Sequence, residues 1–159
     1  MRKPDNQNLS QGMSETGSGD RKTPAPHLSD TDYPEILRRM DELGLMDDSK
    51  FRTEVLDAFL RDASKTIEDL EAAIRASDAA ACELLAHRMR GASLTLGAEK
   101  LGGIALRLEQ FGQDGNLSTA GSLAAALREE FESIRTFFTR LPGIPKAAWP
   151  TAPEHPTSC

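Results

Sequence analysis

The stretch SKFRTEVLDAFLRDASKTIEDLEAAIRA, residues 49–76, carries a helical repeat along its whole length. Its apolar side chains recur in steps of three and four residues, so they would line one face of an α-helix. The residues of this stripe are Phe51, Val55, Phe59, Ala63, Ile67, Leu70 and Ile74. We therefore expect one long amphipathic helix from about Ser49 to Ala76, with this stripe turned towards a core.

Helical periodicity continues on both sides of this stretch, and no segment alternates with the period of a β-strand. The other expected helices run from Asp32 or Tyr33 to Gly44 and over about 78–96, 98–111 and 118–140. Their apolar stripes are Ile36, Met40 and Leu43; Cys82, Leu85, Met89, Ala92 and Leu96; Leu101, Ile104, Ala105, Leu108 and Phe111; and Leu123, Leu127, Phe131, Ile134, Phe138 and Leu141. Ser77 or Asp78 is expected to cap the third helix, and Gly97 to supply the turn after it. The predicted class is all-α: an antiparallel up-and-down four-helix bundle, capped at one end by the short N-terminal helix.

Residues 1–30 and 142–159 are predicted to be disordered tails that flank a bundle domain of residues 31–141. The first thirty residues contain few sizeable apolar side chains, so burial cannot offset the entropy lost on ordering them. The second tail contains five prolines, which fit neither a helix nor a sheet ladder. We expect Trp149 in this Pro-rich C-terminal tail to be an exposed aromatic side chain rather than an anchor for another protein.

The charge and hydropathy of the chain argue against several classes of function. Its 159 residues have a formal net charge of −6, which falls on the bundle because the charges of each tail cancel. An acidic chain with 5% aromatic residues lacks the basic grooves and stacking surfaces of nucleic-acid-binding proteins. No apolar run approaches the ~20 residues of a membrane span, and the N-terminus has no signal-peptide core. We expect a soluble, cytoplasmic protein with neither nucleic acid nor membrane among its partners.

The spacing of cysteines and histidines indicates neither a disulfide nor a metal site. Cys82 lies within a helical pattern and Cys159 is the last residue, so we do not expect them to pair. His27, His87 and His155 are far apart in the sequence, and no cysteine pair has zinc-ligand spacing. Cys82 is expected to fill the core instead.

His87 is predicted to point away from the core. It lies two residues from both Leu85 and Met89 of the apolar stripe, and a turn of about 100° per residue puts it on the opposite face. The same outward face carries Leu84 and Leu94, where a solvated helix would have polar side chains. Most exposed histidines have no function, but an apolar rim around this one indicates a docking surface.

Arg90 and Gly91 extend this surface into a candidate site for phosphoryl transfer. A glycine in mid-helix costs about 1 kcal/mol relative to alanine, and it leaves space for the close approach of another surface. The unprotonated imidazole of His87 can attack phosphorus near neutral pH. The planar fork of Arg90 can hold the oxygens of a phosphoryl group in transfer. The alternative is that Arg90 is a solvated surface charge.

The stretch AHRMRGASLTLGAEKLGGIALRLE, residues 86–109, resembles the signature of the histidine-containing phosphotransfer (HPt) domain of two-component phosphorelays. That signature runs A-H-x-L-K-G-S followed by S or A, then L-G-A, a further L and a later L-E. The matching residues are Ala86, His87, Met89, Arg90, Gly91, Ala92, Ser93, Leu96, Gly97, Ala98, Leu101, Leu108 and Glu109. Arg90 replaces the usual lysine, and Ala92 stands where serine is frequent. The family's four-helix bundle with a short leading helix agrees with the fold expected from periodicity.

The resemblance implies a protein that shuttles a phosphoryl group between the aspartates of response-regulator receiver domains. His87 would be the phosphoacceptor through the ring nitrogen distal to the main chain, and Glu109 would accept a hydrogen bond from the other nitrogen. Arg90 would supply the cation. The receiver-docking residues would be Leu84, Arg88, Gly91 and Leu94. Without the resemblance, Glu109 would be interpreted as an exposed carboxylate paired with Arg107 or Arg88.

The implied partners are receiver domains and an upstream hybrid or histidine kinase, with Mg²⁺ expected only in the receiver. We expect a free-standing monomer without a cofactor. It would be a phosphorelay intermediate and not an enzyme, because the chain has no P-loop or kinase-type glycine loop for ATP. One alternative is a bundle that binds receiver domains or another signalling protein without transferring phosphate. The phosphoacceptor helices of a histidine kinase are disfavoured, because that family has an acidic residue where Arg88 follows His87 and a proline soon after.

Overall fold

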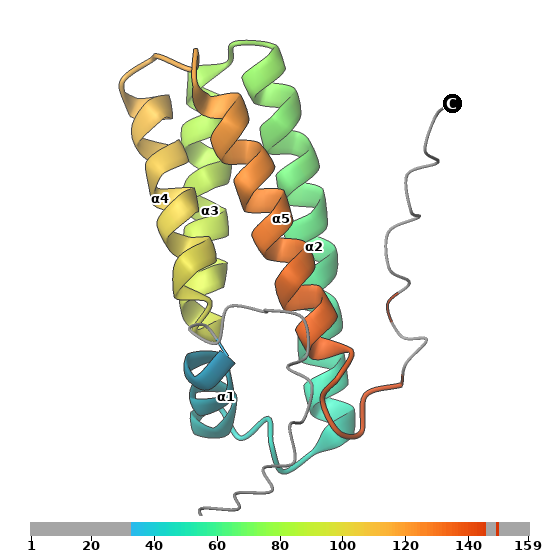
Figure 1. Ribbon diagram of the computed structural model, residues 1–159. Coiled ribbons are helices and arrows are strands. Elements are labelled where there is room, and N and C mark those ends of the chain that lie inside the picture. Colours follow the sequence, from blue (N-terminus) through green and yellow to red (C-terminus); the bar gives the residue numbers. More distant parts are fainter. Residues whose placement is uncertain (1–32, 146–148, 150–159) are drawn as a thin grey trace, which may run out of the picture.

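The computed structural model describes residues 33–145 and Trp149, and within them the chain folds as a four-helix bundle with a short leading helix (Figure 1). The helices are α1 (Tyr33–Glu42), α2 (Ser49–Arg75), α3 (Ala79–Leu96), α4 (Glu99–Gln113) and α5 (Ala120–Phe138). Consecutive long helices run in opposite directions, and α2 also packs against α5, which closes the bundle. α1 lies across the end of the bundle and contacts α3. The predicted all-α class and the antiparallel topology are confirmed. No helix in this described part of the chain is long and apolar enough to cross a membrane.

The core face of α2 is rotated by one residue from the predicted stripe over its first three turns. Leu56 and Leu60 are buried, whereas Phe51 is exposed and Phe59 is only partly covered. Two apolar residues are adjacent at positions 55 and 56, and again at 59 and 60. Two neighbouring faces of the helix therefore both carry apolar side chains at steps of four residues. The face that carries the leucines packs into the core, and the two aromatic side chains lie outside it or at its edge.

Small residues let α3 and α4 pack closely against each other. A Cβ atom at Gly112 would lie 2.5 Å from the backbone nitrogen of Glu83, so no larger residue fits there. On α3, Ala86 and Ser93 face the interior in place of the expected Leu85 and Ala92. Leu85 is only partly buried against the core, and Ala92 is exposed.

The turns around α3 form as the sequence predicts. Asp78 caps the helix, and its side chain accepts a hydrogen bond from the backbone N–H of Ala81 at 3.0 Å. Gly97 ends the helix in the left-handed region with a φ of 79°. A side chain at Gly97 would also meet α1, because its Cβ would lie 2.8 Å from the carbonyl oxygen of Glu35. These two residues therefore fix where α3 begins and ends.

Trp149 packs against the bundle, so the prediction that it is exposed is wrong. Only 7% of the residue is accessible, and its Nε1–H donates to Oδ1 of Asp57 on α2 at 3.0 Å. Its ring lies edge-on to Phe138 of α5, with the ring centres 6.5 Å apart. Ile144 is also buried, beyond the expected end of the bundle at residue 141. The proposed tail of residues 1–30, and all of the second tail after Pro145 except Trp149, lie outside the described residues.

Candidate functional site

His87 lies on the outward face of α3, near the middle of the helix. Its side chain is 61% exposed, whereas its neighbours Ala86 and Met89 are buried in the core. The outward direction expected from the periodicity is therefore confirmed, and the ring is accessible from solvent.

One nitrogen of the His87 ring is held by Glu109 of α4. The Nδ1 atom lies 2.8 Å from Oε1 of this carboxylate, whose side chain is only 8% exposed. A carboxylate can only accept hydrogen bonds, so the contact requires the ring proton to be on Nδ1. In the neutral ring, Nε2 then carries the free lone pair. The contact thus orients the ring and selects the nitrogen that can act as a nucleophile.

Arg90 lies beside the same carboxylate. Its Nε atom is 2.9 Å from Oε2 of Glu109, and its Nη2 donates to Oε1 at 3.5 Å. The same Nη2 lies 3.4 Å from Nδ1 of His87, but this contact is not a hydrogen bond when both atoms carry protons. Oε2 has no well-aligned hydrogen-bond donor in this arrangement. Arg90 therefore acts on Oε2 mainly through its charge.

Three exposed leucines lie on the two helices that form this cluster. Leu84 and Leu94 of α3 are 61% and 51% exposed, as the docking prediction requires. Leu94 packs against Gly102 of α4, since a Cβ atom added to this glycine would lie 3.2 Å from Cδ2 of the leucine. Leu106 of α4 is also exposed, and it was not among the residues predicted for docking. It falls outside the apolar stripe of its helix, which is the signal that could have identified it.

Gly91 is exposed on α3, one turn after His87. A Cβ atom at this position would meet no other atom within 4 Å, so packing within the bundle does not require a glycine there. The free space above this residue is compatible with the close approach of a partner.

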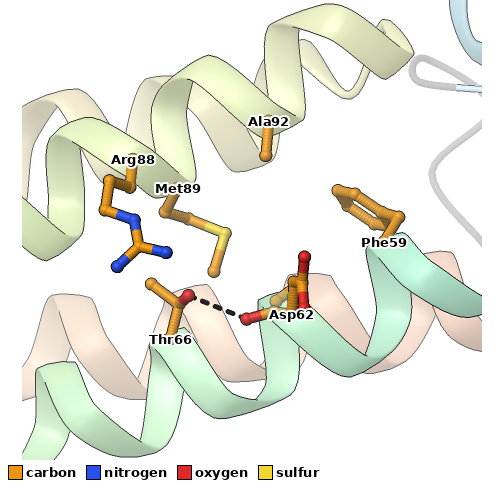
Figure 2. Close-up of a pocket in the computed structure, with 7 residues that line it drawn as sticks. Phe59, Asp62, Thr66, Arg88, Met89 and Ala92 are labelled. Atoms are coloured by element: carbon orange, nitrogen blue, oxygen red, sulfur yellow. Dashed lines mark hydrogen bonds between the residues drawn. The ribbon is translucent and has the colours of Figure 1, made fainter.

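A groove opens between α2 and α3, and Glu109 is not among the residues that line it (Figure 2). Its volume is about 290 Å³. The lining residues are Phe59, Asp62, Ala63, Thr66, Arg88, Met89 and Ala92. Arg88 extends across this groove towards α2 and, like Arg107, forms no ion pair with Glu109 among the described contacts. Arg88 therefore belongs to the groove rather than to the charged cluster at His87.

Position 92 is alanine here, where related sequences often have serine. The hydroxyl group of the next residue, Ser93, does not take its place. The Ser93 hydroxyl is buried and donates to the carbonyl oxygen of Met89 at 2.7 Å. Its side chain faces the core, whereas Ala92 is exposed and lines the groove. Neither position therefore presents a hydroxyl group at the surface beside His87.

The described residues contain no group of three or more His, Cys, Asp or Glu side chains that could hold a metal ion. Cys82 is buried, as predicted for a core residue, and burial raises the pKa of its thiol. His27, His155 and Cys159 lie outside the described residues.

The similarity to known proteins covers the bundle and the site. The family model for the Hpt domain matches residues 54–137. The crystal structure of histidine-containing phosphotransfer protein B (HptB) from Pseudomonas aeruginosa PAO1 matches with a TM-score of 0.60 and 31% sequence identity. That match covers 74% of this chain and 95% of HptB. No curated protein sequence is a significant match. The chain therefore belongs to the Hpt domain family, whose members transfer phosphoryl groups through a histidine in phosphorelays.

Proposed function

We propose that His87 is the phosphoacceptor of this protein and that it carries the phosphoryl group on Nε2. The observation that supports this assignment best is the contact between Nδ1 of His87 and the buried carboxylate of Glu109. In the neutral ring this contact leaves the lone pair on Nε2, and the ring is exposed and fixed in direction.

The transfer is a nucleophilic displacement at phosphorus. The Nε2 lone pair attacks the phosphorus of an aspartyl phosphate, the N–P bond forms, and the P–O bond to the aspartate breaks. The electron pair of the broken bond returns to the aspartate as a carboxylate. The phosphorylated ring retains its proton on Nδ1, and its positive charge is stabilised by Glu109. Attack by a second aspartate on the same phosphorus reverses these steps and frees Nε2.

The docking surface would be the outward face of α3 with the groove beside it. Leu84 and Leu94 would contact apolar side chains of a receiver domain, and Gly91 would let its backbone approach His87 closely. Arg88 would contact the receiver at the edge of the groove. Arg90 would hold phosphoryl oxygens during transfer through the N–H groups that Glu109 does not engage.

The partners would be receiver domains of response regulators and an upstream hybrid or histidine kinase. We expect no cofactor on this chain, because Mg²⁺ would be bound by the receiver, and no ATP-dependent autokinase activity. The protein would act as a cytoplasmic monomer, since the described helices close their own core.

Phosphoryl transfer from a receiver tests this proposal. A receiver domain labelled on its aspartate with radioactive phosphate is mixed with the full chain, and the transferred label is tested for lability in acid and stability in base. Wild type should take up acid-labile label, and His87→Gln should take up none while its circular dichroism spectrum is unchanged. Binding of the receiver without any uptake of label by wild type would show a non-transferring adaptor instead.

A further inference from the structure

Three aromatic rings form a continuous contact between Trp149 and the groove that lies beside α3. The ring centres of Trp149 and Phe138 are 6.5 Å apart, with an angle of 63° between the ring planes. Those of Phe138 and Phe59 are 6.3 Å apart, with an angle of 74°. Both pairs have the separation and the edge-to-face geometry that aromatic rings favour. Trp149 is therefore connected to Phe59 through one intervening ring.

Phe59 is the residue at which this contact meets the groove. It lies on α2, its side chain is partly buried, and it lines the groove together with Arg88 and Ala92 of α3 (Figure 2). The intervening ring of Phe138 is fully buried. In the proposed function the groove belongs to the receiver-docking surface. The position of the Phe59 ring then contributes to the shape of the surface that a receiver contacts.

We infer that Trp149 is a positioning residue for receiver docking, which holds Phe138 against Phe59 and so fixes one wall of the groove. This inference rests on the proposed function, because it matters only where the groove contacts a receiver. Trp149 lies outside the charged cluster at His87 and takes no part in the transfer step. It sets how tightly the receiver binds, and the rate of transfer in the bound complex does not depend on it.

Trp149 is itself fixed to α2 close to Phe59. Its Nε1–H donates to Oδ1 of Asp57 at 3.0 Å, and Oδ2 of the same carboxylate pairs with Arg61 at 3.0 Å. The hydrogen bond restrains the indole ring in its contact with Phe138. Asp57 and Phe59 belong to the same turn of α2, so the attachment point of Trp149 and the wall of the groove move together.

Loss of the indole ring would leave a space beside Phe138. A structure around such a space relaxes only in part, and neighbouring side chains shift towards it. A shift of Phe138 changes its contact with Phe59, whose partly buried ring is then less restrained in the groove. Packed side chains can carry coupling energy between separate sites in this way. Removal of Trp149 should therefore weaken docking at a surface that Trp149 does not form.

The first experiment is carbon-13 NMR of the phenylalanine rings in the unphosphorylated full chain, which needs no receiver. The signals of Phe59 are identified by their loss in Phe59→Leu. They should move in Trp149→Ala and keep their wild-type positions in Ile74→Ala. Ile74 is the matched control, because it also packs against the core but lies about 22 Å from Phe59 along α2.

The second experiment measures label transfer from a receiver domain that wild type accepts, at increasing receiver concentrations. In Trp149→Ala the concentration that gives half of the maximal rate should rise about three- to tenfold, within the range of coupling between packed neighbours. The maximal rate should stay at the wild-type value, and Ile74→Ala should keep both values. Phe59→Ala should raise the half-maximal concentration by itself. Addition of Trp149→Ala to that variant should cause no further rise.

Asp57→Ala tests the same coupling with all three rings in place. It removes the acceptor of the indole hydrogen bond and an exposed ion pair with Arg61, which contributes little to stability. The half-maximal concentration should rise as in Trp149→Ala, but by a smaller factor. If Trp149→Ala does not fold, Asp57→Ala decides the question.

Wild-type Phe59 signals and a wild-type receiver dependence in Trp149→Ala and Asp57→Ala would overturn the inference. An equal effect in Ile74→Ala would also overturn it, as would a further rise when Trp149→Ala is added to Phe59→Ala. A lower maximal rate at an unchanged half-maximal concentration would place the effect on the transfer step and contradict a role in docking. A wild-type chain that accepts no label from any receiver would contradict the proposed function, whereas the Phe59 signals would still test the ring contact.

Discussion

Glu109 reaches Nδ1 of His87 from a neighbouring helix, and the two atoms that meet are 2.8 Å apart. The distance depends on how closely α3 and α4 pack. Gly112, three residues after Glu109, has space for no side chain against the backbone of α3 at Glu83. The packing of the two helices thus sets the hydrogen bond that, in the proposed function, leaves Nε2 of the neutral ring free to attack phosphorus.

Loss of the Glu109 carboxylate should slow phosphoryl transfer without abolishing it. In Glu109→Ala, Nε2 of His87 is still present, but the ring is free to rotate and to place its proton on either nitrogen. A hydrogen bond to a charged group contributes about 1.5–3 kcal/mol, so the rate of label uptake should fall about ten- to a hundredfold. Rapid-quench measurement of the first turnover checks this value. An unchanged rate would show that Glu109 does not orient the ring.

Alanine at Gly112 should destabilise the bundle. Its Cβ would lie 2.5 Å from the nitrogen and 2.7 Å from Cα of Glu83, and backbone atoms cannot move aside as a flexible side chain can. We expect a loss of about 3 kcal/mol in the free energy of unfolding, measured by urea denaturation. Gly103→Ala is the control, because a Cβ there meets no atom within 4 Å. That variant should be more stable than wild type by about 0.5–1 kcal/mol.

If Gly112→Ala were as stable as Gly103→Ala, close contact between the two backbones would not limit the packing of α3 on α4. The distance between His87 and Glu109 would then need another cause.

The fold was predictable because each long helix repeats its apolar pattern over several turns. The rotation of each helix was less predictable. At 55–56 and 59–60 two adjacent apolar residues define two equally good faces, and only tertiary packing selects Leu56 and Leu60 for the core. The outward direction of His87 was predictable from the same periodicity, because His87 lies two residues before the buried Met89 and is therefore turned about 200° away from it around the helix. The pairing of Glu109 with His87 was not, because it joins two helices, and only the resemblance to the HPt signature indicated it.

Trp149 shows a different limit of sequence reasoning. It has no periodic neighbours, and prolines surround it in the sequence. Its partner Asp57 lies 92 residues earlier in the chain. Local composition predicted an exposed side chain, whereas a contact over this sequence separation is visible only in the folded structure.

Removal of the Trp149 side chain should therefore destabilise the bundle. Trp149→Ala loses the buried indole ring, its contact with Phe138 and the hydrogen bond to Asp57, and we expect a cost of about 3 kcal/mol. Trp149→Phe keeps an aromatic ring and loses the hydrogen bond, so its cost should be about 1 kcal/mol. Urea denaturation followed by circular dichroism measures both. Equal midpoints for wild type and Trp149→Ala would contradict the packing of this residue on α2 and α5.

The ion pair between Glu71 of α2 and Arg128 of α5 should make part of the stability depend on pH. Arg128 donates through Nε and Nη2 to the two carboxylate oxygens, at 2.7 and 2.9 Å. These hydrogen bonds lower the pKa of Glu71 from its ordinary value of 4.5, against the opposing effect of partial burial. Because the folded-state pKa is the lower one, the stabilisation is complete above the unfolded-state pKa and disappears as the pH falls through the folded-state pKa.

Glu71→Gln should thus destabilise the protein near pH 7 and have a progressively smaller effect as the pH falls below 4.5. The effect at pH 7 should not exceed about 1 kcal/mol, since both side chains are partly exposed. Urea denaturation at several pH values measures the difference from wild type, with Glu129→Gln, an exposed carboxylate on α5, as the control. A difference that grows on acidification would have the wrong sign for a carboxylate with a lowered pKa.

The most direct test of the account is the identity of the atom that carries the phosphoryl group. The full chain is phosphorylated by a receiver domain, and phosphorus-31 and nitrogen-15 NMR then locate the N–P bond. The predicted result is a single phosphohistidine at His87 with phosphorus on Nε2 and the remaining ring proton on Nδ1. Phosphorus on Nδ1, or label retained in His87→Gln, would contradict it.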